Sequence, residues 1–456
     1  MTRVATARLI HRMDILRKAV KMLSSYALCD HCLGRQLALL GHGIENDERG
    51  GAIKLVLEFK AHEAVLSGNQ RSLKLLEVLA LNGFCETAEQ TLGLLGKPLS
   101  SKVHRRKCFL CEDTFASCSD LAKMALELLK EYEYSSFLVG VELPVHVAER
   151  EDEFKAAFEV DRGESLRNEF GRVVGKIIVE STGKSVDFKR PEVVVLVNPF
   201  TGKVRLQVNP LFVGGRYRKL VRDIPQSKWF CSKCRGKGCK QCGWTGKMYP
   251  ESVQEIVEKP ILEAAGGVEA SFHASGREDI DARMLGKGRP FVLEVSKPKK
   301  RFLNLAKLEE AVNASGKGKV EIIGLRLADR EGVRLLKKSE ATQKRYRVLV
   351  EFEKEVSEEE LQALKNALAN VVVKQRTPLR VLHRRADLTR ERYIYELNVK
   401  RLSPKKAEMK IRCQGGLYVK ELVTGDEGRT VPSVSEILSN KASPLKLDVL
   451  EIVMDK

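Results

Sequence analysis

The chain has 456 residues, of which 43% are hydrophobic, so it is long enough for two to four domains with sizeable cores. Its formal net charge is +19, with 80 Lys and Arg against 61 Asp and Glu, which makes a polyanion, and above all a nucleic acid, the expected partner. No stretch approaches the roughly 18 consecutive apolar residues of a membrane span, and the charged N-terminus lacks the apolar core of a signal peptide. We therefore expect a cytoplasmic protein that does not bind a membrane.

The first 130 residues are predicted to be mostly helical, because apolar residues recur there at helical spacing. The helices are expected at 5–24, 51–65, 70–82 and 119–132. After residue 135 the pattern changes to strand, helix and two further strands around a Pro-Phe-Thr-Gly turn. These elements are expected at 135–143, 164–181 and 192–213.

The second half of the chain alternates between strands and helices. Strands are predicted near 268–274, 290–296, 318–327, 345–352, 391–402, 406–413 and 444–453. Helices are predicted near 303–314, 357–369, 417–423 and 432–440. Strands outnumber helices and several are close enough for hairpins, which favours an α+β domain around a mixed or antiparallel sheet over a doubly wound fold.

Eight of the eleven cysteines form four CxxC pairs, which in a cytosolic chain indicates metal binding and not disulfides. Two pairs are adjacent in "CSKCRGKGCKQC", where four thiolates can surround one tetrahedral zinc ion. The ligands of this expected structural site are Cys231, Cys234, Cys239 and Cys242. The other two pairs lie about eighty residues apart in the chain. They can close a second zinc site formed by Cys29, Cys32, Cys108 and Cys111, with four ordinary buried thiols as the alternative.

No nucleotide or other organic cofactor is expected. The segment "STGKS" resembles the end of a phosphate-binding loop, but Ile178 stands where the first glycine of GxxxxGK[ST] is required. "GKGRP" lacks the further glycines of a dinucleotide-binding loop. A methyltransferase or a thiolation enzyme should carry a glycine-rich cofactor loop, and the sequence has none.

Three segments resemble the signature motifs of RNA pseudouridine synthases. "SGREDIDARMLG" contains the GR-x-D signature, "QKRYRVLV" resembles the second motif, and "GGLYVKELVTGDEGRT" resembles the third. The resemblance implies that Asp279 is the essential carboxylate, that Tyr346 lies in the pocket, and that Lys420 is the basic residue of the third motif. Many relatives have Arg at the position of Lys420.

The combination of these motifs with "QRTPLRVLHRRAD" resembles specifically the archaeal tRNA pseudouridine synthases of the tenth type. Upstream, "TGKSVDFKRPEVVVLVNP" and "VGGRYRKL" are similar to a THUMP domain, a tRNA-binding module. Membership would imply isomerisation of uridine to pseudouridine in the T-loop of tRNA, at positions 54 and 55. Whether one or both uridines react, and whether the Asp acts as nucleophile or as base, stays open.

The chemistry gives these residues physical roles. An ionised carboxylate at the sugar can act as nucleophile or as base at C2′, and Lys420 would pair with Asp279 and keep it ionised. Tyr346 can stack on the displaced base and assist proton transfer from C5. The target uridine must leave its stack, and Arg277 is a candidate to fill the gap or to hold a phosphate. The remaining candidates for RNA binding are Arg376, Arg380, Arg384, Arg385, Tyr418 and Arg429.

The resulting domain scheme has three parts. Residues 1–228 form an accessory RNA-binding region, with a helical zinc-linked part at 1–130 and a THUMP-like part at about 85–215. Residues 229–250 form the four-cysteine zinc knuckle, and 251–456 form the pseudouridine synthase catalytic domain. We expect a monomer that binds tRNA. The alternative is an RNA-binding scaffold without catalytic activity, in which the THUMP and zinc modules carry the whole function.

Overall fold

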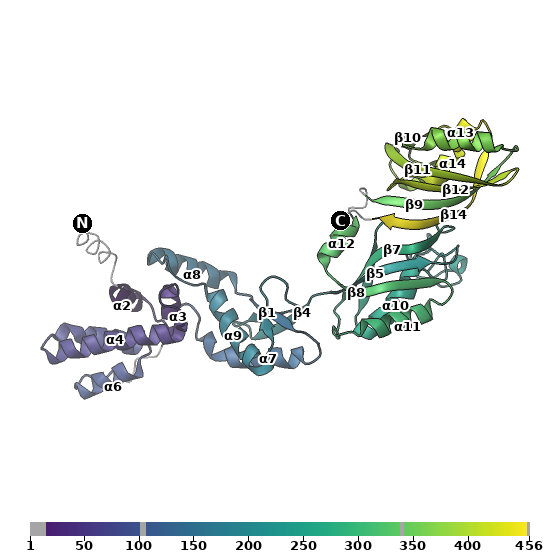
Figure 1. Ribbon diagram of the computed structural model, residues 1–456. Helices are drawn as coiled ribbons and strands as arrows, with labels where there is room; N and C mark the ends of the chain where they lie inside the picture. The colour runs from purple at the N-terminus through teal and green to yellow at the C-terminus, as the bar shows by residue number, and fades with distance from the viewer. Residues whose placement is uncertain (1–14, 101–105, 338–341, 454–456) are drawn as a thin grey trace, which may run out of the picture. The chain divides into compact units, whose positions relative to one another are not determined.

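The computed structural model describes residues 15–100, 106–337 and 342–453. The chain divides between Asn209 and Pro210 into two compact units (Figure 1). No helix in the described ranges is both long enough and apolar enough to cross a membrane. The first ten residues of the helix predicted at 5–24 lie outside the described ranges.

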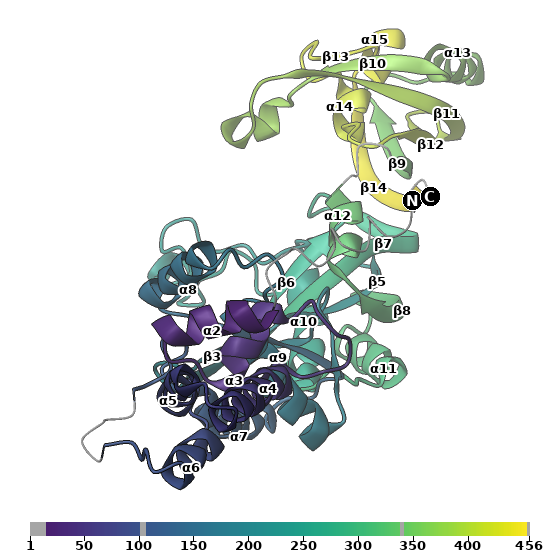
Figure 2. The same cartoon turned by 90° about the vertical axis from the view of Figure 1, so that its left-hand side faces the viewer.

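The first unit consists of a helical part followed by a small α/β part. Its helices are α2 (Ile15–Ser25), α3 (Asp30–Gly34), α4 (Asn46–Leu66), α5 (Leu73–Leu81), α6 (Glu86–Leu94), α7 (Cys118–Leu129), α8 (Val145–Ala157) and α9 (Leu166–Thr182). Its strands are β1 (Ser136–Val141), β2 (Ser185–Val186), β3 (Val193–Asn198) and β4 (Lys203–Val208). The sheet has the order β2-β1-β3-β4, with β1 parallel to both neighbours and β3–β4 an antiparallel hairpin. Helices α7 and α9 pack against each other and against this sheet (Figure 2).

Helix α9 shows how the sequence determines these elements. Its buried side chains follow the spacing i, i+4, i+8, which places Leu166, Phe170 and Val174 on one face. The Ser165 side chain caps the first turn by accepting the N–H of Asn168 at 3.1 Å. Gly183, at φ +65°, ends the helix in the left-handed conformation.

Helices α3 and α4 meet through glycine. A Cβ atom on Gly34 would stand 1.8 Å from the carbonyl oxygen of Asn46, and one on Gly50 would stand 2.1 Å from that of Asp30. The two backbones therefore touch directly. This contact fixes α3, the helix that begins immediately after Cys29.

The second unit is built on one ten-stranded sheet with the order β13-β10-β11-β12-β9-β14-β7-β5-β8, to which β6 adds by pairing with β7. Its strands are β5 (Leu211–Lys219), β6 (Glu269–Ala274), β7 (Arg283–Ser296), β8 (Val320–Ala328), β9 (Gln343–Phe352), β10 (Val371–Arg376), β11 (Thr389–Ser403), β12 (Lys406–Gln414), β13 (Thr430–Val431) and β14 (Ala442–Val453). All pairs are antiparallel except β7–β14, which is parallel.

Helices cover this sheet at both of its ends. They are α10 (Val253–Ala265), α11 (Leu305–Ser315), α12 (Arg330–Lys337), α13 (Glu358–Leu368), α14 (Val419–Thr424) and α15 (Val434–Ile437). Helices α10 and α11 pack on the β5–β7–β8 end, and α13 packs on β11 (Figure 1). The two ends have separate hydrophobic cores, and Tyr346 on β9 packs against both.

The predicted fold class, a multidomain α+β protein, is confirmed. The structure adds β5, β10, β13 and several helices that the sequence pattern did not predict, and β7 begins at Arg283 instead of near 290. Strand β5 pairs with β7 and β8, so residues 210–228 belong to the second unit and not to the accessory region expected at 1–228.

The contact between α3 and α4 predicts a large difference between two glycine substitutions. Gly34→Ala should destabilise the first unit by about 1–3 kcal/mol or more, because its methyl group would overlap the backbone of α4. Gly93→Ala, at a helical glycine with open space around it, should be neutral or stabilising by about 0.5–1 kcal/mol. Chemical unfolding followed by circular dichroism measures both. Equal effects of the two substitutions would contradict the close packing of α3 on α4.

Candidate active site and metal centres

The loop that joins β6 to β7, residues 275–282, carries the GR-x-D segment. Gly276 has φ +77°, a left-handed conformation that favours glycine. A Cβ atom there would stand 3.1 Å from Arg289 Nη1 and 3.1 Å from Lys344 Nζ. The glycine of the motif thus allows both the turn of the loop and the close approach of two cations beneath it.

Glu278 anchors the loop to the protein interior. Its carboxylate is buried, accepts the Arg289 Nε–H at 2.9 Å and accepts the Tyr217 hydroxyl at 2.8 Å. Gln226 donates to the same hydroxyl at 2.7 Å and to the carbonyl of Gly276 at 3.0 Å. Burial, and then the charge of Glu278, raise the pKa of Tyr217 well above its ordinary value, so the phenol keeps its proton. Buried charges require such complete pairing to be tolerated.

Lys219, on β5, also fixes this loop, by hydrogen bonds to its backbone carbonyl groups. Its fully buried ammonium group donates to the carbonyls of Ile224 at 2.8 Å, Asp279 at 3.1 Å and Ile280 at 2.9 Å. All three of its protons are therefore used. Burial lowers the pKa of Lys219 to about 8, although the neighbouring carboxylates of Glu278 and Asp281 oppose this shift.

The side chain of Asp279 projects from this loop between two cations. Lys420 Nζ lies 3.3 Å from its Oδ2, and Arg380 Nη1 donates to its Oδ1 at 3.1 Å. The carboxylate is 32% exposed, so an incoming group can reach it. Asp279 therefore lies within reach of two positively charged side chains that fix its orientation.

Asp281 competes for the same lysine. Lys420 Nζ is closer to Asp281, at 2.7 Å, than to Asp279, but Asp281 is 58% exposed. Partial burial raises the pKa of Asp281, while the hydrogen bond from Lys420 lowers it more, so its pKa lies below the ordinary value. The expected pairing of Lys420 with Asp279 is present, and the lysine is shared between the two carboxylates.

Arg380 is the second cation, and the sequence had indicated only an RNA contact for it. Its Nε donates to the buried Glu421 at 2.6 Å while its Nη1 reaches Asp279. Burial lowers its pKa, but the two carboxylates raise it by more, so the guanidinium remains charged. The pair Glu421–Arg380 therefore fixes the position of a permanent positive charge beside Asp279.

A cleft of about 540 Å³ opens in front of these groups. Lys344 and Tyr346 lie two positions apart on β9, so they share one face of the strand. Both line the cleft, together with Asp279. Burial raises the pKa of the Tyr346 phenol above its ordinary value. Burial, with the charge of Arg289, lowers the pKa of the Lys344 ammonium to about 8. Besides Lys420, Arg380, Lys344 and Arg289, the cations that line the cleft are Arg277, Arg385, Arg390 and Arg392.

The remaining predicted RNA-binding residues are placed as follows. Arg385 Nη1 donates to the Tyr418 hydroxyl at 2.8 Å, and both residues line the cleft. Arg376 pairs with Asp387 at 2.7 Å. Arg429 donates to the carbonyl of Thr377 and lies 2.5 Å from Asp387, so its donors bond within the protein.

The last two predicted RNA-binding residues are Arg384 and Arg277. The side chain of Arg384 lies outside what the structure describes. Arg277 lies over the ring of Trp229 at 5.4 Å, which links the loop 275–282 to the cysteine-rich segment 229–250.

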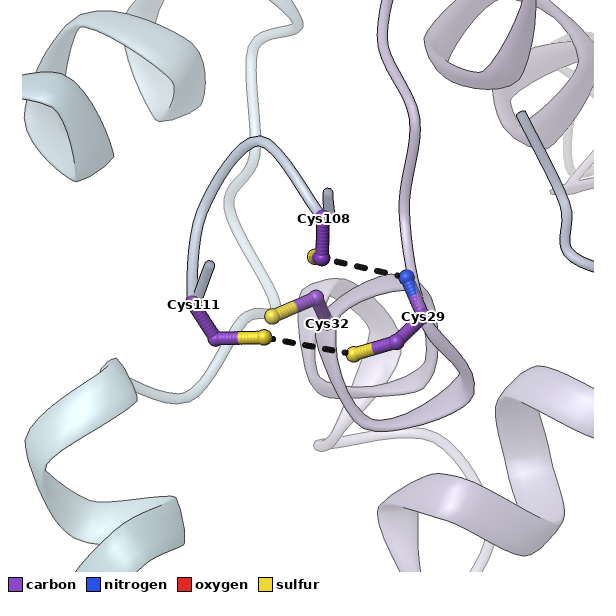
Figure 3. A group of neighbouring side chains, drawn as sticks. All are labelled: Cys29, Cys32, Cys108 and Cys111. Atoms are coloured by element: carbon purple, nitrogen blue, oxygen red, sulfur yellow. Dashed lines mark hydrogen bonds between the residues drawn. The ribbon is translucent and has the colours of Figure 1, made fainter. Parts of the chain in front are cut away.

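The first cysteine cluster brings distant parts of the chain together. Cys29 and Cys32 stand at the start of α3, and Cys108 and Cys111 lie in a turn before α7 (Figure 3). The four sulfur atoms lie within 4.8 Å of one another. Two nearby side chains that could also bind metal are not part of the cluster: His31 Nδ1 is bonded to Glu169 at 2.7 Å, and Cys118 lies outside the group.

The second cluster is local. Cys231, Cys234, Cys239 and Cys242 also have their sulfur atoms within 4.8 Å of one another. Backbone N–H groups point at these sulfurs, from Gly238 to Cys234 at 3.2 Å and from Gly246 to Cys242 at 3.3 Å. Loss of solvent contact raises the pKa of Cys242, but the N–H groups of Cys239 and Gly246 lower it by more, to about 6, which favours the thiolate form that binds metal.

The sulfur spacing in both clusters suits a tetrahedral metal ion. Four ligands at about 2.3 Å from a zinc ion would stand about 3.8 Å apart. The spacing is 3.6 Å for Cys29–Cys111, 3.8 Å for Cys231–Cys239 and 3.8 Å for Cys234–Cys242. Both groups of cysteines can therefore hold a metal ion.

The sequence analysis missed the supporting residues of the site. Lys344 could have been found, because it lies two positions before Tyr346 on one strand and must face the same side. Glu278 is adjacent to Asp279, but only the structure reveals its buried partner Arg289. No local signal marks Lys219 or Glu421, which reach the site through strand pairing and helix packing.

Two family models match the chain. The model "Pus10, C-terminal" covers residues 212–453, and "Pus10 THUMP domain, archaeal" covers residues 121–198. The predicted THUMP domain is confirmed, within narrower limits than 85–215.

Curated relatives match over nearly the whole chain. A tRNA pseudouridine synthase Pus10 of Methanocaldococcus jannaschii is 44% identical, over 95% of this chain and 93% of its own length. The proteins of the same name from Methanothrix thermoacetophila and Methanopyrus kandleri are 41% and 39% identical, over 96% of this chain and 94% and 98% of their own lengths. Because the sequences are identical at this level over nearly the full length of this chain and of each relative, the chain belongs to the Pus10 family and is a tRNA pseudouridine synthase, an isomerase.

Proposed function

We propose that this enzyme isomerises uridine to pseudouridine in the T-loop of tRNA, at positions 54 and 55, and that Asp279 is its essential carboxylate. The observation that carries the proposal is the placement of Asp279, whose carboxylate is fixed between Lys420 and Arg380 at the mouth of a cationic cleft. A scaffold without catalytic activity would have no use for a carboxylate held in this way.

The reaction exchanges one bond to the sugar for another. The C1′–N1 bond breaks and its electrons stay on the uracil ring, the ring turns, and C5 bonds to C1′. C5 then loses its proton and N1 gains one, so no external reductant or energy source is needed. Asp279 can serve as the nucleophile at the sugar or as the base at C2′, and both routes require its ionised form.

The other residues of the cleft position the substrate. The target uridine has to leave the base stack to enter a cleft of this size, at a cost of a few kcal/mol. Tyr346 offers its ring to the displaced uracil and its protonated hydroxyl group to the proton transfers at C5 and N1. Lys420 and Arg380 orient the carboxylate of Asp279, while Lys219 and Glu278 fix the backbone of its loop.

RNA binding is proposed to rest on arginines around the cleft and on the THUMP domain. Arg385, Arg390 and Arg392 line the cleft, and Arg376 and Arg384 lie in the same segment of the chain. Guanidinium groups suit phosphate oxygens because they donate two parallel hydrogen bonds. Their number, and the net charge of +19, fit a long polyanionic substrate.

We also propose that each cysteine cluster holds one structural zinc ion. Four thiolates would fill the tetrahedral coordination of zinc and leave no open position for a substrate or a water molecule, so these ions would stabilise the fold and take no part in the chemistry. Cys29, Cys32, Cys108 and Cys111 would join two segments of the first unit. The other four cysteines would fold the knuckle.

For the catalytic residue, we predict that Asp279→Asn abolishes pseudouridine formation and leaves tRNA affinity nearly unchanged. Asparagine keeps the size but lacks the charge, whereas affinity is spread over many phosphate contacts. The matched control is Asp281→Asn, which removes the other carboxylate paired with Lys420 and should be much milder. Mapping of pseudouridine on unmodified tRNA transcripts provides the readout. If Asp281→Asn silences the enzyme and Asp279→Asn does not, the assignment is wrong.

For the metal sites, the purified protein should contain two zinc ions per chain. Replacing Cys234 by Ser should remove one ion, because the knuckle forms locally, and leave the other in place. Cys413→Ser is the control, since Cys413 is buried on β12 outside both clusters. Elemental analysis that finds no zinc in the wild type would rule out both sites.

For RNA binding, tRNA affinity should fall steeply with salt, because cations on the protein release counterions from the phosphates. A fall of at least about tenfold is expected between 50 mM and 200 mM salt if several phosphates are neutralised. Arg385→Gln should reduce the slope of log K against log salt by about one. A dissociation constant that is independent of salt would contradict this mode of binding.

A further inference from the structure

The knuckle formed by residues 229–250 exposes two aromatic side chains. Trp244 is 71% exposed and Phe230 is 60% exposed. Tryptophan is normally well buried, because its large apolar ring gains more than most side chains by leaving water. The other tryptophan of the chain, Trp229, lies beneath Arg277 and packs edge-on against Tyr249. The exposed ring of Trp244 therefore indicates a surface that binds another molecule.

The backbone holds Trp244 in this exposed position. Its φ of +66° lies in the left-handed region, which a bulky residue rarely adopts. Its N–H donates to the carbonyl of Cys239 at 2.9 Å, and its own carbonyl lies so close to Gly238 that a Cβ there would stand 2.8 Å away. These constraints come from the turn that carries Cys239 and Cys242, so the backbone of Trp244 is fixed by the same turn that brings the two cysteines together.

The charges around the ring all have one sign. Residues 228–250 contain six Lys and Arg and no Asp or Glu. Lys247 lies 2.5 Å from Glu255 and Lys228 lies 3.6 Å from Glu258, so these two lysines anchor the knuckle to α10. The other four are exposed and have no carboxylate partner in the described part of the chain: Lys233, Arg235, Lys237 and Lys240.

From these observations we infer that the knuckle is a second RNA-binding site, in which Trp244 stacks on an unpaired base of the tRNA while the four exposed cations bind the adjacent phosphates. Any base presents a flat face to an indole ring, so this site would select single-stranded nucleotides by shape and not by sequence. The inference takes tRNA as the substrate and in that respect rests on the proposed function.

The site is continuous with the catalytic loop. Arg277, which precedes Glu278 and Asp279, lies over the ring of Trp229, and Trp229 bonds through its carbonyl to the N–H of Met248 in the knuckle. An RNA strand whose uridine enters the cleft would thus pass the knuckle within the same unit. A protein partner would instead have to supply an acidic surface, and it is one of the outcomes that the test separates.

The direct test uses the intrinsic fluorescence of Trp244. In a Trp229→Phe, Asp279→Asn double variant, Trp244 is the single tryptophan, and no reaction changes the RNA during titration. Addition of unmodified tRNA transcript should quench its emission, with a midpoint equal to the dissociation constant measured independently by filter binding. Emission that is unchanged at saturating tRNA would overturn the inference and direct attention to a protein partner. Because catalysis is not required, this result does not depend on whether Asp279 is the essential residue.

A second test measures affinity. Trp244→Ala should weaken tRNA binding by about tenfold, in the range found for loss of one stacked base, while Trp244→Phe should retain most of it. Val268→Ala, at a side chain that is 69% exposed, is the control and should have no effect. The zinc content of each variant shows whether the knuckle has stayed folded. Wild-type affinity in a zinc-loaded Trp244→Ala protein would overturn the inference.

Discussion

The loop that carries Asp279 depends on one buried ion pair, between Glu278 and Arg289. Two charges taken out of water cost several kcal/mol each, and the protein repays this only through complete hydrogen bonding by Tyr217, Gln226 and the backbone. The arrangement locks the residue immediately before Asp279. With Lys219 holding the next carbonyls, the loop has little freedom left, so the position of the exposed carboxylate is set by groups that a substrate never contacts.

The local spacing of apolar residues predicted many of the helices and strands. Most of the elements and contacts that it did not predict depend on pairing between residues far apart in the sequence. Helices with a clear apolar period, such as α9 and α13, and strands such as β12 were predicted near their observed limits. Strand β5 was not, because its sequence "LFVGGRYRK" mixes glycine and charge, and only its position between β7 and β8 makes it a strand. The motif residues Asp279, Tyr346 and Lys420 could be proposed from sequence alone, and they line one cleft. Arg380 as a partner of Asp279 could not be predicted, since the two lie 101 positions apart.

The two cysteine clusters illustrate two ways of ordering a chain. In the knuckle, the four cysteines are so close in sequence that a metal site and the turns would form together, which suits a small segment without a hydrophobic core. In the first unit, the second pair of cysteines is separated from the first by several helices, and the cluster sits among buried apolar residues. There the direct contact of α3 with α4 through Gly34 and Gly50 already places two of the four cysteines, Cys29 and Cys32.

The cationic cleft also bears on turnover. An isomerisation leaves the mass and the charge of the RNA unchanged, so Arg385, Arg390 and Arg392 would hold the product as firmly as the substrate. Nothing in the electrostatics favours departure of the finished tRNA. Any difference in affinity between the substrate RNA and the product RNA must therefore arise at the base itself. There the new glycosidic bond to carbon frees N1 as an additional hydrogen-bond donor. An enzyme that held its substrate in this way would be prone to inhibition by its own product unless the refolded RNA withdrew that base.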